Sequence, residues 1–264
     1  MNRCERMLAF ERIPAPHFVS TRMGGVSGGV NRSLNLSDRT GDRPGNVREN
    51  RRRVSIDAGI DPETWTLGEQ IHGVSVAIVT AGHRGAGHIA DVPPIPSVDA
   101  LVTEEPGICL CVLVADCIPV LLCDRSLRAV AAIHAGRKGI ERNIIRETIE
   151  VLRGNFGIAP EELQVGVGPS IGACCYPVDR DVAEAFARSS RWPEGVVIEP
   201  SAGEGWKPRL NLRSAAQALL IEAGVPGDSI EHIDVCTACH RNRFFSHRGD
   251  SGHTGRFGAG IVLP

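Results

Sequence analysis

Short apolar segments separated by polar turns run along most of this chain and predict a mixture of strands and helices. Apolar runs of this length, each bounded by glycine, proline, aspartate or charged residues, are typical of strands. The close succession of runs between residues 98 and 134, with only Asp124-Arg125-Ser126 as a turn between two of them, indicates local hairpin pairing. The expected strands cover residues 74–80, 98–102, 108–114, 120–123, 129–133, 164–167, 230–235, 243–246 and 260–263.

Four other segments have the periodicity of helices. The clearest is residues 139–156, where apolar side chains recur on one face and Gly157 and Pro160 follow as stop signals. Further helices are expected over residues 46–58, 179–189 and 212–223. Strands and helices mixed in this way favour an α+β or mixed α/β architecture. The glycine- and proline-rich span 81–96 is better interpreted as a surface excursion than as a domain boundary.

Composition and charge exclude several classes of protein. Hydrophobic residues make up 42% and charged residues 23% of the 264 residues, which are values of a globular protein. The net charge of -2 gives no general attraction to nucleic acid or to an anionic membrane, and we interpret the arginine-rich stretch 48–53 as mostly a solvated helix face. No apolar run approaches the roughly 20 residues that cross a bilayer, and residues 1–10 lack the apolar core of a secretory signal. A cytoplasmic protein is expected.

Nine cysteines without an export signal are expected to be reduced thiols or metal ligands. Cys174 and Cys175 could form a strained vicinal disulfide, but free thiols are the simpler expectation. The segment from Cys236 to His240 has the spacing of a c-type haem attachment site, which export would have to accompany. A metal site there would lack a second Cys-x-x-Cys pair. We therefore expect a structural role for it, or a place near the substrate.

His72, Cys117 and His134 are the strongest candidates for chemistry. Each is a metal ligand that ends an apolar stretch, and strand ends can bring such residues together. Two histidines and one cysteine leave the fourth position of a tetrahedral zinc open to water, as in catalytic sites. Zinc lowers the pKa of such a water to about 7. The three positions therefore predict a catalytic zinc site.

Several motifs follow one another in a fixed order from about residue 18 to the C-terminus, and together they resemble the bacterial YfiH-like family. Members of that family were labelled polyphenol oxidases or laccase-domain proteins and are now described as zinc-dependent purine nucleoside enzymes. The motifs comprise residues 21–27, 33–36, 41–42, 46–51, 70–73, 115–120, 134–136, 168–172, 174–176 and 244–248.

The resemblance implies one catalytic domain over residues 1–264, built of mixed β-sheets flanked by helices. It also implies phosphorolysis of adenosine, inosine, guanosine and S-methyl-5'-thioadenosine, and deamination of adenosine. The family's metal ligands map onto His72, Cys117 and His134, of which Cys117 and His134 are also catalytic candidates. This chain departs from the family in carrying Arg137-Lys138 where Trp-Arg is usual, which puts substrate preference in question more than metal binding.

Four residues are candidates for binding the substrate or phosphate. The guanidinium of Arg22 could hold phosphate or ribose, because it matches phosphate oxygens in a bidentate way, although an ordinary ion pair is the alternative. The loop of residues 24–29 lacks the ending of a phosphate-binding P-loop and is better interpreted as support for Arg22. Asn35 lies in a matched motif, and Arg248 and Arg256 lie in a glycine-rich tail.

Asp116 directly precedes Cys117 and could orient a histidine ligand or carry a proton during catalysis. Neighbouring residues of a strand point to opposite faces, so this role requires the strand to end before Asp116.

Other functions remain open at the level of sequence. Cys117 and His134 could act without metal as nucleophile and base of a hydrolase or deamidase, although His72 would then have no reason to join them. A copper polyphenol oxidase is disfavoured against zinc, because its copper centre would need a weak axial methionine and only Met1, Met7 and Met23 exist. A noncatalytic zinc-binding accessory protein is the non-enzyme alternative.

Overall fold

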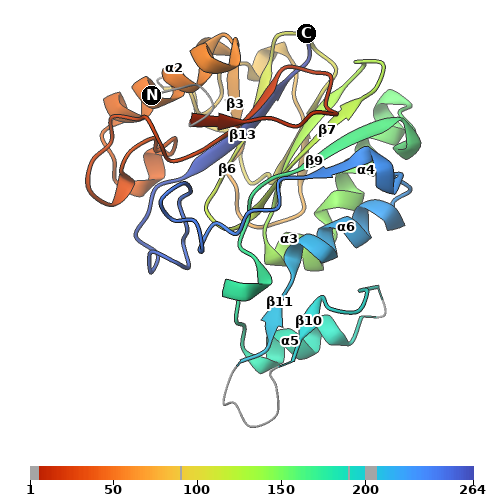
Figure 1. Ribbon diagram of the computed structural model, residues 1–264. Helices are drawn as coiled ribbons and strands as arrows, with labels where there is room; N and C mark the ends of the chain where they lie inside the picture. The colour runs from red at the N-terminus through yellow and green to blue at the C-terminus, as the bar shows by residue number, and fades with distance from the viewer. Residues whose placement is uncertain (1–5, 90, 190, 200–206) are drawn as a thin grey trace.

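The computed structural model describes residues 6–89, 91–189, 191–199 and 207–264, and two β-sheets packed face to face form its centre (Figure 1). The six-stranded sheet has the order β12 (Ile230–His232), β9 (Leu163–Val167), β7 (Ile118–Asp124), β8 (Val130–Ala135), β5 (Ala100–Thr103) and β4 (Val76–Ile78). The five-stranded sheet has the order β1 (Met7–Leu8), β2 (His17–Ser20), β13 (Phe257–Val262), β6 (Cys109–Val114) and β3 (Trp65–Leu67).

Helices cover the outer faces of both sheets. Helix α2 (Pro44–Ala58) lies against the five-stranded sheet, whereas α3 (Arg137–Glu141), α4 (Ile144–Phe156) and α6 (Leu212–Glu222) lie against the six-stranded sheet (Figure 1). Helix α5 (Arg180–Ala187) and the hairpin of β10 (Val197–Ile198) and β11 (Arg209–Leu210) extend from this body. The expected α+β architecture of mixed sheets flanked by helices is confirmed.

The two-residue period of each strand divides its side chains between layers. In β6, Leu110 and Val112 point into the core between the sheets, while Cys109 and Cys111 pack on the α2 side. In β7 the residues alternate in the same way: Leu121 faces the core between the sheets and its neighbours face the helices. Cys109 and Cys111 are therefore both buried, and their thiols serve as small apolar side chains.

The chain passes from one sheet to the other between β6 and β7. Strand β6 ends at Val114, β7 begins at Ile118, and the intervening bend contains Asp116 with a positive φ of 91°. The backbone NH of Ile171 donates to the Asp116 carbonyl over 2.9 Å and holds this bend. The strand thus ends before Asp116, and Cys117 is presented where the two sheets meet.

Two sequence-based expectations about the elements were wrong, and one was only partly right. Of the strands between residues 98 and 134, β7 and β8 form the expected hairpin, whereas β6 lies in the other sheet and pairs with β3 and β13. The helix expected over residues 139–156 is broken at Asn143, which has a left-handed φ of 63° and whose side chain caps α4 by accepting from the NH of Arg146. Residues 243–246 form a turn, a bend and irregular backbone instead of a strand, and the Ser246 hydroxyl donates to Asp116.

Within the described residues, no helix has both the length and the apolarity required to cross a bilayer. Residues 1–5 of the N-terminal segment interpreted above lie outside the described residues.

Candidate metal centre

His72, Cys117 and His134 meet at the edge where the two sheets join, as expected. Their ligand atoms all lie within 4.8 Å of one another. His134 belongs to β8 and is buried, Cys117 lies in the bend before β7, and His72 lies in the exposed turn after β3. The two imidazole rings are 4.8 Å apart between centroids and inclined by 78°. Two nitrogens and one sulfur so arranged make a donor set that suits zinc.

Gly136 shows that this space is kept open for the ligands. A Cβ atom at this position would lie 2.9 Å from Cδ2 of His72, 3.1 Å from Sγ of Cys117 and 3.8 Å from Cε1 of His134. The backbone of Gly136 is extended, with φ of -78°, so glycine is required here by space and not by its torsion angle. The three side chains therefore close around a site that even a methyl group would disturb, which fits a bound ion.

Asp99 orients two of the three ligands and was missed at the level of sequence. Its Oδ1 lies 2.8 Å from Nδ1 of His134, and its carboxylate accepts from the backbone NH groups of His72 and Gly73 at 2.9 and 2.7 Å. Since a carboxylate only accepts, His134 donates from Nδ1 and directs Nε2 toward the centre. The buried Asp99 directly precedes β5, where the sequence indicated only the beginning of a strand.

Charges are coupled within the centre. Burial alone would raise the pKa of the Cys117 thiol, but His134 and His72 outweigh burial and lower its pKa to about 6. Burial alone would lower the pKa of His134, but Cys117 and Asp99 raise that pKa to about 9. Each group therefore favours the charged form of the other. A metal would replace the proton between them, since metal ligands must be deprotonated.

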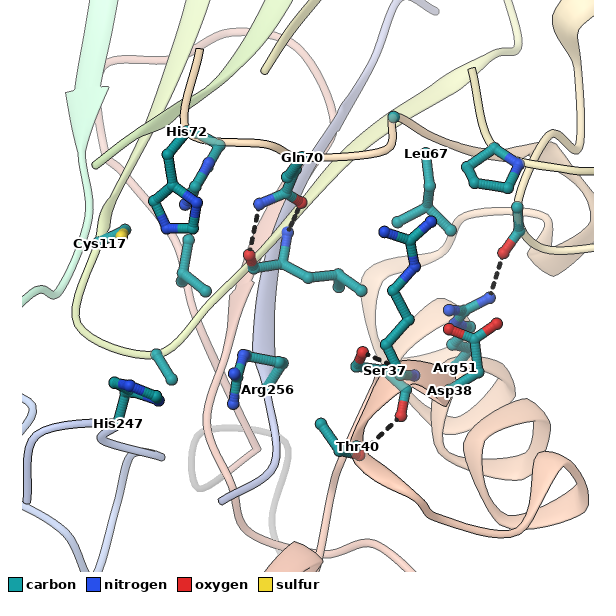
Figure 2. Close-up of a pocket in the computed structure, with 18 residues that line it drawn as sticks. Ser37, Asp38, Thr40, Arg51, Leu67, Gln70, His72, Cys117, His247 and Arg256 are labelled. Carbon is teal, nitrogen blue, oxygen red and sulfur yellow. Dashed lines mark hydrogen bonds between the residues drawn. The ribbon is translucent and has the colours of Figure 1, made fainter. Parts of the chain in front are cut away.

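The three ligands line one end of a cavity of about 440 Å³ (Figure 2). The turn carrying His72 is fixed there by Gln70, whose side chain exchanges two hydrogen bonds with the backbone of Leu113 at 2.7 and 2.8 Å. Three arginines, Arg39, Arg51 and Arg256, also line the cavity. A volume of this size accommodates a small-molecule substrate, and the arginines favour an anion.

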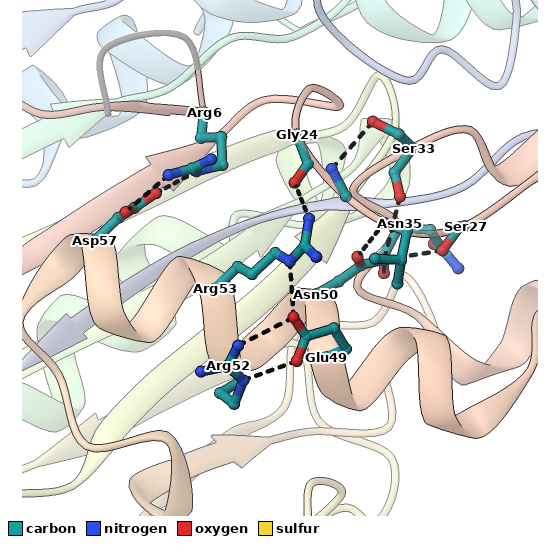
Figure 3. Close-up of polar contacts among 12 residues, drawn as sticks. Arg6, Gly24, Ser27, Ser33, Asn35, Glu49, Asn50, Arg52, Arg53 and Asp57 are labelled. Atoms are coloured by element: carbon teal, nitrogen blue, oxygen red, sulfur yellow. Dashed lines mark hydrogen bonds and ion pairs between the residues drawn. The ribbon is translucent and has the colours of Figure 1, made fainter. Parts of the chain in front are cut away.

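Arg51 corrects our interpretation of residues 48–53 as a solvated face. Its side chain is only 4% exposed, and it donates to the carbonyl oxygens of Leu36 and Gly87 at 3.0 and 2.9 Å. Burial lowers the pKa of its guanidinium. The neighbouring Arg52 and Arg53 instead pair with Glu49 on the outside of α2 (Figure 3).

Arg22 lies away from this cavity. It lines a separate depression formed by residues 22–27 and their neighbours, its guanidinium stacks 4.4 Å above the ring of Phe245, and its Nη1 donates to the Arg241 carbonyl at 2.7 Å. The glycine-rich loop beside it is bound to α2: Arg53 donates to the Gly24 carbonyl, and Asn50 donates to Ser27 (Figure 3). This geometry does not support the expectation that Arg22 anchors phosphate at the metal centre.

Asn35 is fully buried, and its side chain forms hydrogen bonds within the protein instead of lining the cavity. Its Nδ2 donates to the Ser37 carbonyl and to Asp42, while its Oδ1 accepts from the NH of Arg256 at 2.8 Å. It therefore positions Arg256, the expected binding residue that does reach the cavity.

The carboxylate of Asp116 accepts three hydrogen bonds. It accepts from the hydroxyls of Thr237 and Ser246 at 2.6 and 2.7 Å and from the NH of Arg248 at 2.6 Å. Arg248 in turn donates to the Pro177 carbonyl and stacks over Tyr176, 5.2 Å from the ring centroid. Three donors on Asp116 favour a role in positioning this loop over the expected role as a proton carrier.

Arg137 follows Gly136 and begins α3 beside the centre. Its Nη1 pairs with Glu141 at 3.1 Å. Burial raises the pKa of Tyr176, while the nearby charge of Arg137 acts in the opposite direction. Arg137 thus places a cation beside the centre, and its effect on substrate preference stays a prediction.

Comparison with known proteins bears on this site. Residues 16–264 match the family described as multi-copper polyphenol oxidoreductase laccase. The chain belongs to this laccase-domain family. A purine nucleoside phosphorylase of Bacteroides thetaiotaomicron is 33% identical, over 98% of this chain and 97% of that protein. Adenosine deaminase RL5 of an unknown prokaryotic organism is 32% identical, over 81% of each chain.

A solved structure of the family has the same fold. The hypothetical protein YfiH of Bacillus licheniformis superimposes with a TM-score of 0.87 at 31% identity, covering 94% of this chain and 92% of that one. The resemblance drawn from the motifs is confirmed.

The copper chemistry in the family's description finds little support among the described residues. Met7 is buried in the cluster that contains Phe18 and Trp65, and Met23 lines the depression beside Arg22. Neither thioether reaches the centre as an axial ligand, which a blue-copper site would use.

Proposed function

We propose that the protein is a zinc-dependent purine nucleoside enzyme. It would cleave adenosine, inosine, guanosine and S-methyl-5'-thioadenosine with phosphate and would deaminate adenosine by hydrolysis. The names of its relatives support an enzyme of purine nucleosides in general. The observation that carries the proposal for this chain is the placement of His72, Cys117 and His134 at one end of a cavity lined by arginines.

Each residue has a distinct part in the proposal. His72, Cys117 and His134 would hold the zinc, which when bound lowers the pKa of a water to about 7. Asp99 keeps Nε2 of His134 directed at the centre. The bend at Asp116 presents Cys117, and no proton transfer is assigned to it.

Arg256 is the proposed anchor for phosphate. It lines the cavity together with the metal ligands, and its Nη1 is fixed by the carbonyl oxygens of Thr254 and Gly255 at 2.9 and 3.0 Å. Burial lowers the pKa of its guanidinium, while the charges of Cys117 and Asp116 oppose that effect. A guanidinium remains protonated near neutral pH and forms bidentate hydrogen bonds with phosphate oxygens.

The direct test incubates protein of measured zinc content with each nucleoside, with and without phosphate, and identifies the products. Ribose 1-phosphate and free base, formed only with phosphate, are expected from phosphorolysis. Inosine formed from adenosine without phosphate is expected from deamination. Absence of both products from zinc-loaded protein would reject the proposal in favour of a noncatalytic zinc-binding role.

A second candidate function rests on the contacts that link Cys117 to His134 and His134 to Asp99. A thiolate with a lowered pKa, an adjacent imidazole and a carboxylate that orients it are the parts of a cysteine hydrolase or deamidase. His72 separates the two functions, because only a metal needs a second imidazole directed at the same sulfur. His72→Ala should abolish zinc binding and nucleoside turnover, whereas a metal-free hydrolase would retain its thiol chemistry.

A further inference from the structure

We propose that Cys174, Cys175, Cys236 and Cys239 form a second metal site, which binds one zinc ion through four thiolates. Their sulfur atoms all lie within 4.8 Å of one another. Two segments far apart in the sequence contribute them: the 3-10 turn Ala173–Cys175 and the turn that follows β12. The objection that Cys236 and Cys239 lack a second cysteine pair is thus removed by the fold.

The sulfur spacing fits a single tetrahedral ion. With a zinc–sulfur bond of about 2.3 Å, the edges of the tetrahedron are about 3.8 Å. Sγ of Cys239 lies 3.6 Å from Sγ of Cys174 and 3.4 Å from Sγ of Cys175. Four protein ligands leave no open position, which is the pattern of structural zinc sites. The site therefore differs in chemistry from the three-ligand centre at Cys117.

The surroundings of the cluster resemble those of a bound thiolate. The backbone NH of Gly172 donates to Sγ of Cys236 at 3.2 Å, the kind of hydrogen bond that supports metal ligands. A Cβ at Gly172 would lie 3.1 Å from Cβ of Cys236 and 3.2 Å from Sγ of Cys174. As at Gly136, glycine keeps the space beside the ligands open. Cys174 and Cys239 are exposed, so an ion can enter from solvent.

An ion here would stabilise the bend that presents Cys117. The first segment reaches that bend through Ile171, whose NH donates to the Asp116 carbonyl. The second reaches it through Thr237, whose hydroxyl donates to the Asp116 carboxylate at 2.6 Å. Joining the two segments through one ion would fix Ile171 and Thr237, two of the residues that donate to Asp116, at once. The second zinc is thus structural and supports the geometry of the catalytic centre without touching substrate.

The test counts metal ions in the full chain, purified with zinc under reducing conditions. Wild type should hold two zinc ions per chain, Cys117→Ala one, Cys239→Ser one, and the double variant none. Cys123→Ala, which removes a buried thiol outside both clusters, should hold two. The proposal would be overturned if wild type held one zinc ion per chain and Cys239→Ser also held one.

Cobalt substitution identifies the ligands and does not depend on variants of the cluster folding. In Cys117→Ala protein the remaining cobalt should show the intense absorption of four thiolates bound to tetrahedral cobalt. A weak spectrum with little sulfur character, or no bound cobalt, would contradict the site. A disulfide is the alternative, and the intact mass of zinc-free wild type protected from reductant would be two hydrogens lower for each one. That mass, together with no uptake of a second ion after reduction, would overturn the proposal.

Discussion

Asp99 is the residue whose replacement separates orientation of the ligands from ligation itself. Asp99→Asn keeps the size of the side chain, but the amide places a donor among groups that already donate, namely His134 and two backbone NH groups. Loss of a partner that orients a metal ligand typically lowers metal affinity about 10- to 100-fold. Competition with a zinc chelator should show this loss. Asp124→Asn, a buried carboxylate elsewhere, should leave zinc affinity unchanged.

Gly136 provides a test of space at the centre. Gly136→Ala would place a methyl group 2.9 Å from the His72 ring and 3.1 Å from the Cys117 sulfur, so the ligands would separate. We expect at least a 10-fold loss of zinc affinity from this displacement, measured by the same competition. The matched control is Gly154→Ala, at an exposed helical position with nothing within 4 Å of the new Cβ. It should retain zinc and stabilise the fold by about 0.5–1 kcal/mol. Normal zinc binding in Gly136→Ala would contradict the packing described here.

Among single residues, the convergence of His72, Cys117 and His134 could be predicted because their chemistry is rare and their motifs are shared with a family. Asp99 could not, since one carboxylate at the beginning of an apolar run carries no sign of its partners. The burial of Arg51 could not be predicted, because it lies among other arginines and the sequence does not show which side of the helix faces a cavity. Asp116 was singled out as a proton carrier, because its three hydrogen-bond donors, Thr237, Ser246 and Arg248, lie far away in the sequence and could not be foreseen.

The β7–β8 hairpin contains an electrostatic contact that can be tested by pH. The buried carboxylate of Asp124 accepts from the NH and the guanidinium of Arg128 at 2.8–3.1 Å. Burial alone would raise the pKa of Asp124, but Arg128 lowers it below the ordinary 3.8. The contact therefore stabilises the protein above about pH 4 and ceases to do so as pH falls through the lowered value in the folded state.

Replacement of Asp124 by asparagine should lower the free energy of unfolding by about 1 kcal/mol near pH 7, a modest value because Arg128 is partly exposed to solvent. Urea unfolding at several pH values measures it. The difference from wild type should shrink below pH 4. A difference that stayed constant down to pH 3 would show that the contribution is steric and not electrostatic.

Among the elements, the positions of strands could be predicted better than their pairing. The expected strands at β5 to β9 lie close to where the structure has them, because each is a short apolar run. The sequence did not show that the chain moves from one sheet to the other after β6. Apolar runs that belong to two packed sheets look alike in sequence. The split between α3 and α4 depends on one left-handed residue, Asn143, within an otherwise helical pattern.

At the scale of the whole molecule, the cavity predicts where phosphate acts. Arg256→Gln removes a charge that lines the cavity beside the metal ligands. We expect the KM for phosphate to rise about 10- to 100-fold, the range for losing a charge-assisted hydrogen bond, with little change in adenosine deamination. Arg22→Gln, in the separate depression, is the matched control and should leave that KM within about twofold. A KM for phosphate that rises in Arg22→Gln and stays unchanged in Arg256→Gln would instead place the phosphate site at Arg22.

The arrangement of the whole chain could be predicted only through its resemblance to a family. Periodicity supported mixed strands and helices, whereas the face-to-face packing of the sheets depends on contacts between distant segments. The four-cysteine cluster shows the same limit, because residues 174–175 and 236–239 are joined only by the fold. The assignment of residues 1–264 to one catalytic domain stays a prediction.

The central claim is that an ion held by His72, Cys117 and His134 is required for nucleoside turnover. The most direct measurement titrates zinc into metal-free protein while following phosphate-dependent release of base from inosine. Wild type should gain turnover in proportion to zinc bound at this centre, and Cys117→Ala should remain inactive at every zinc concentration. Full turnover by metal-free wild type, or restored turnover in Cys117→Ala, would contradict the account.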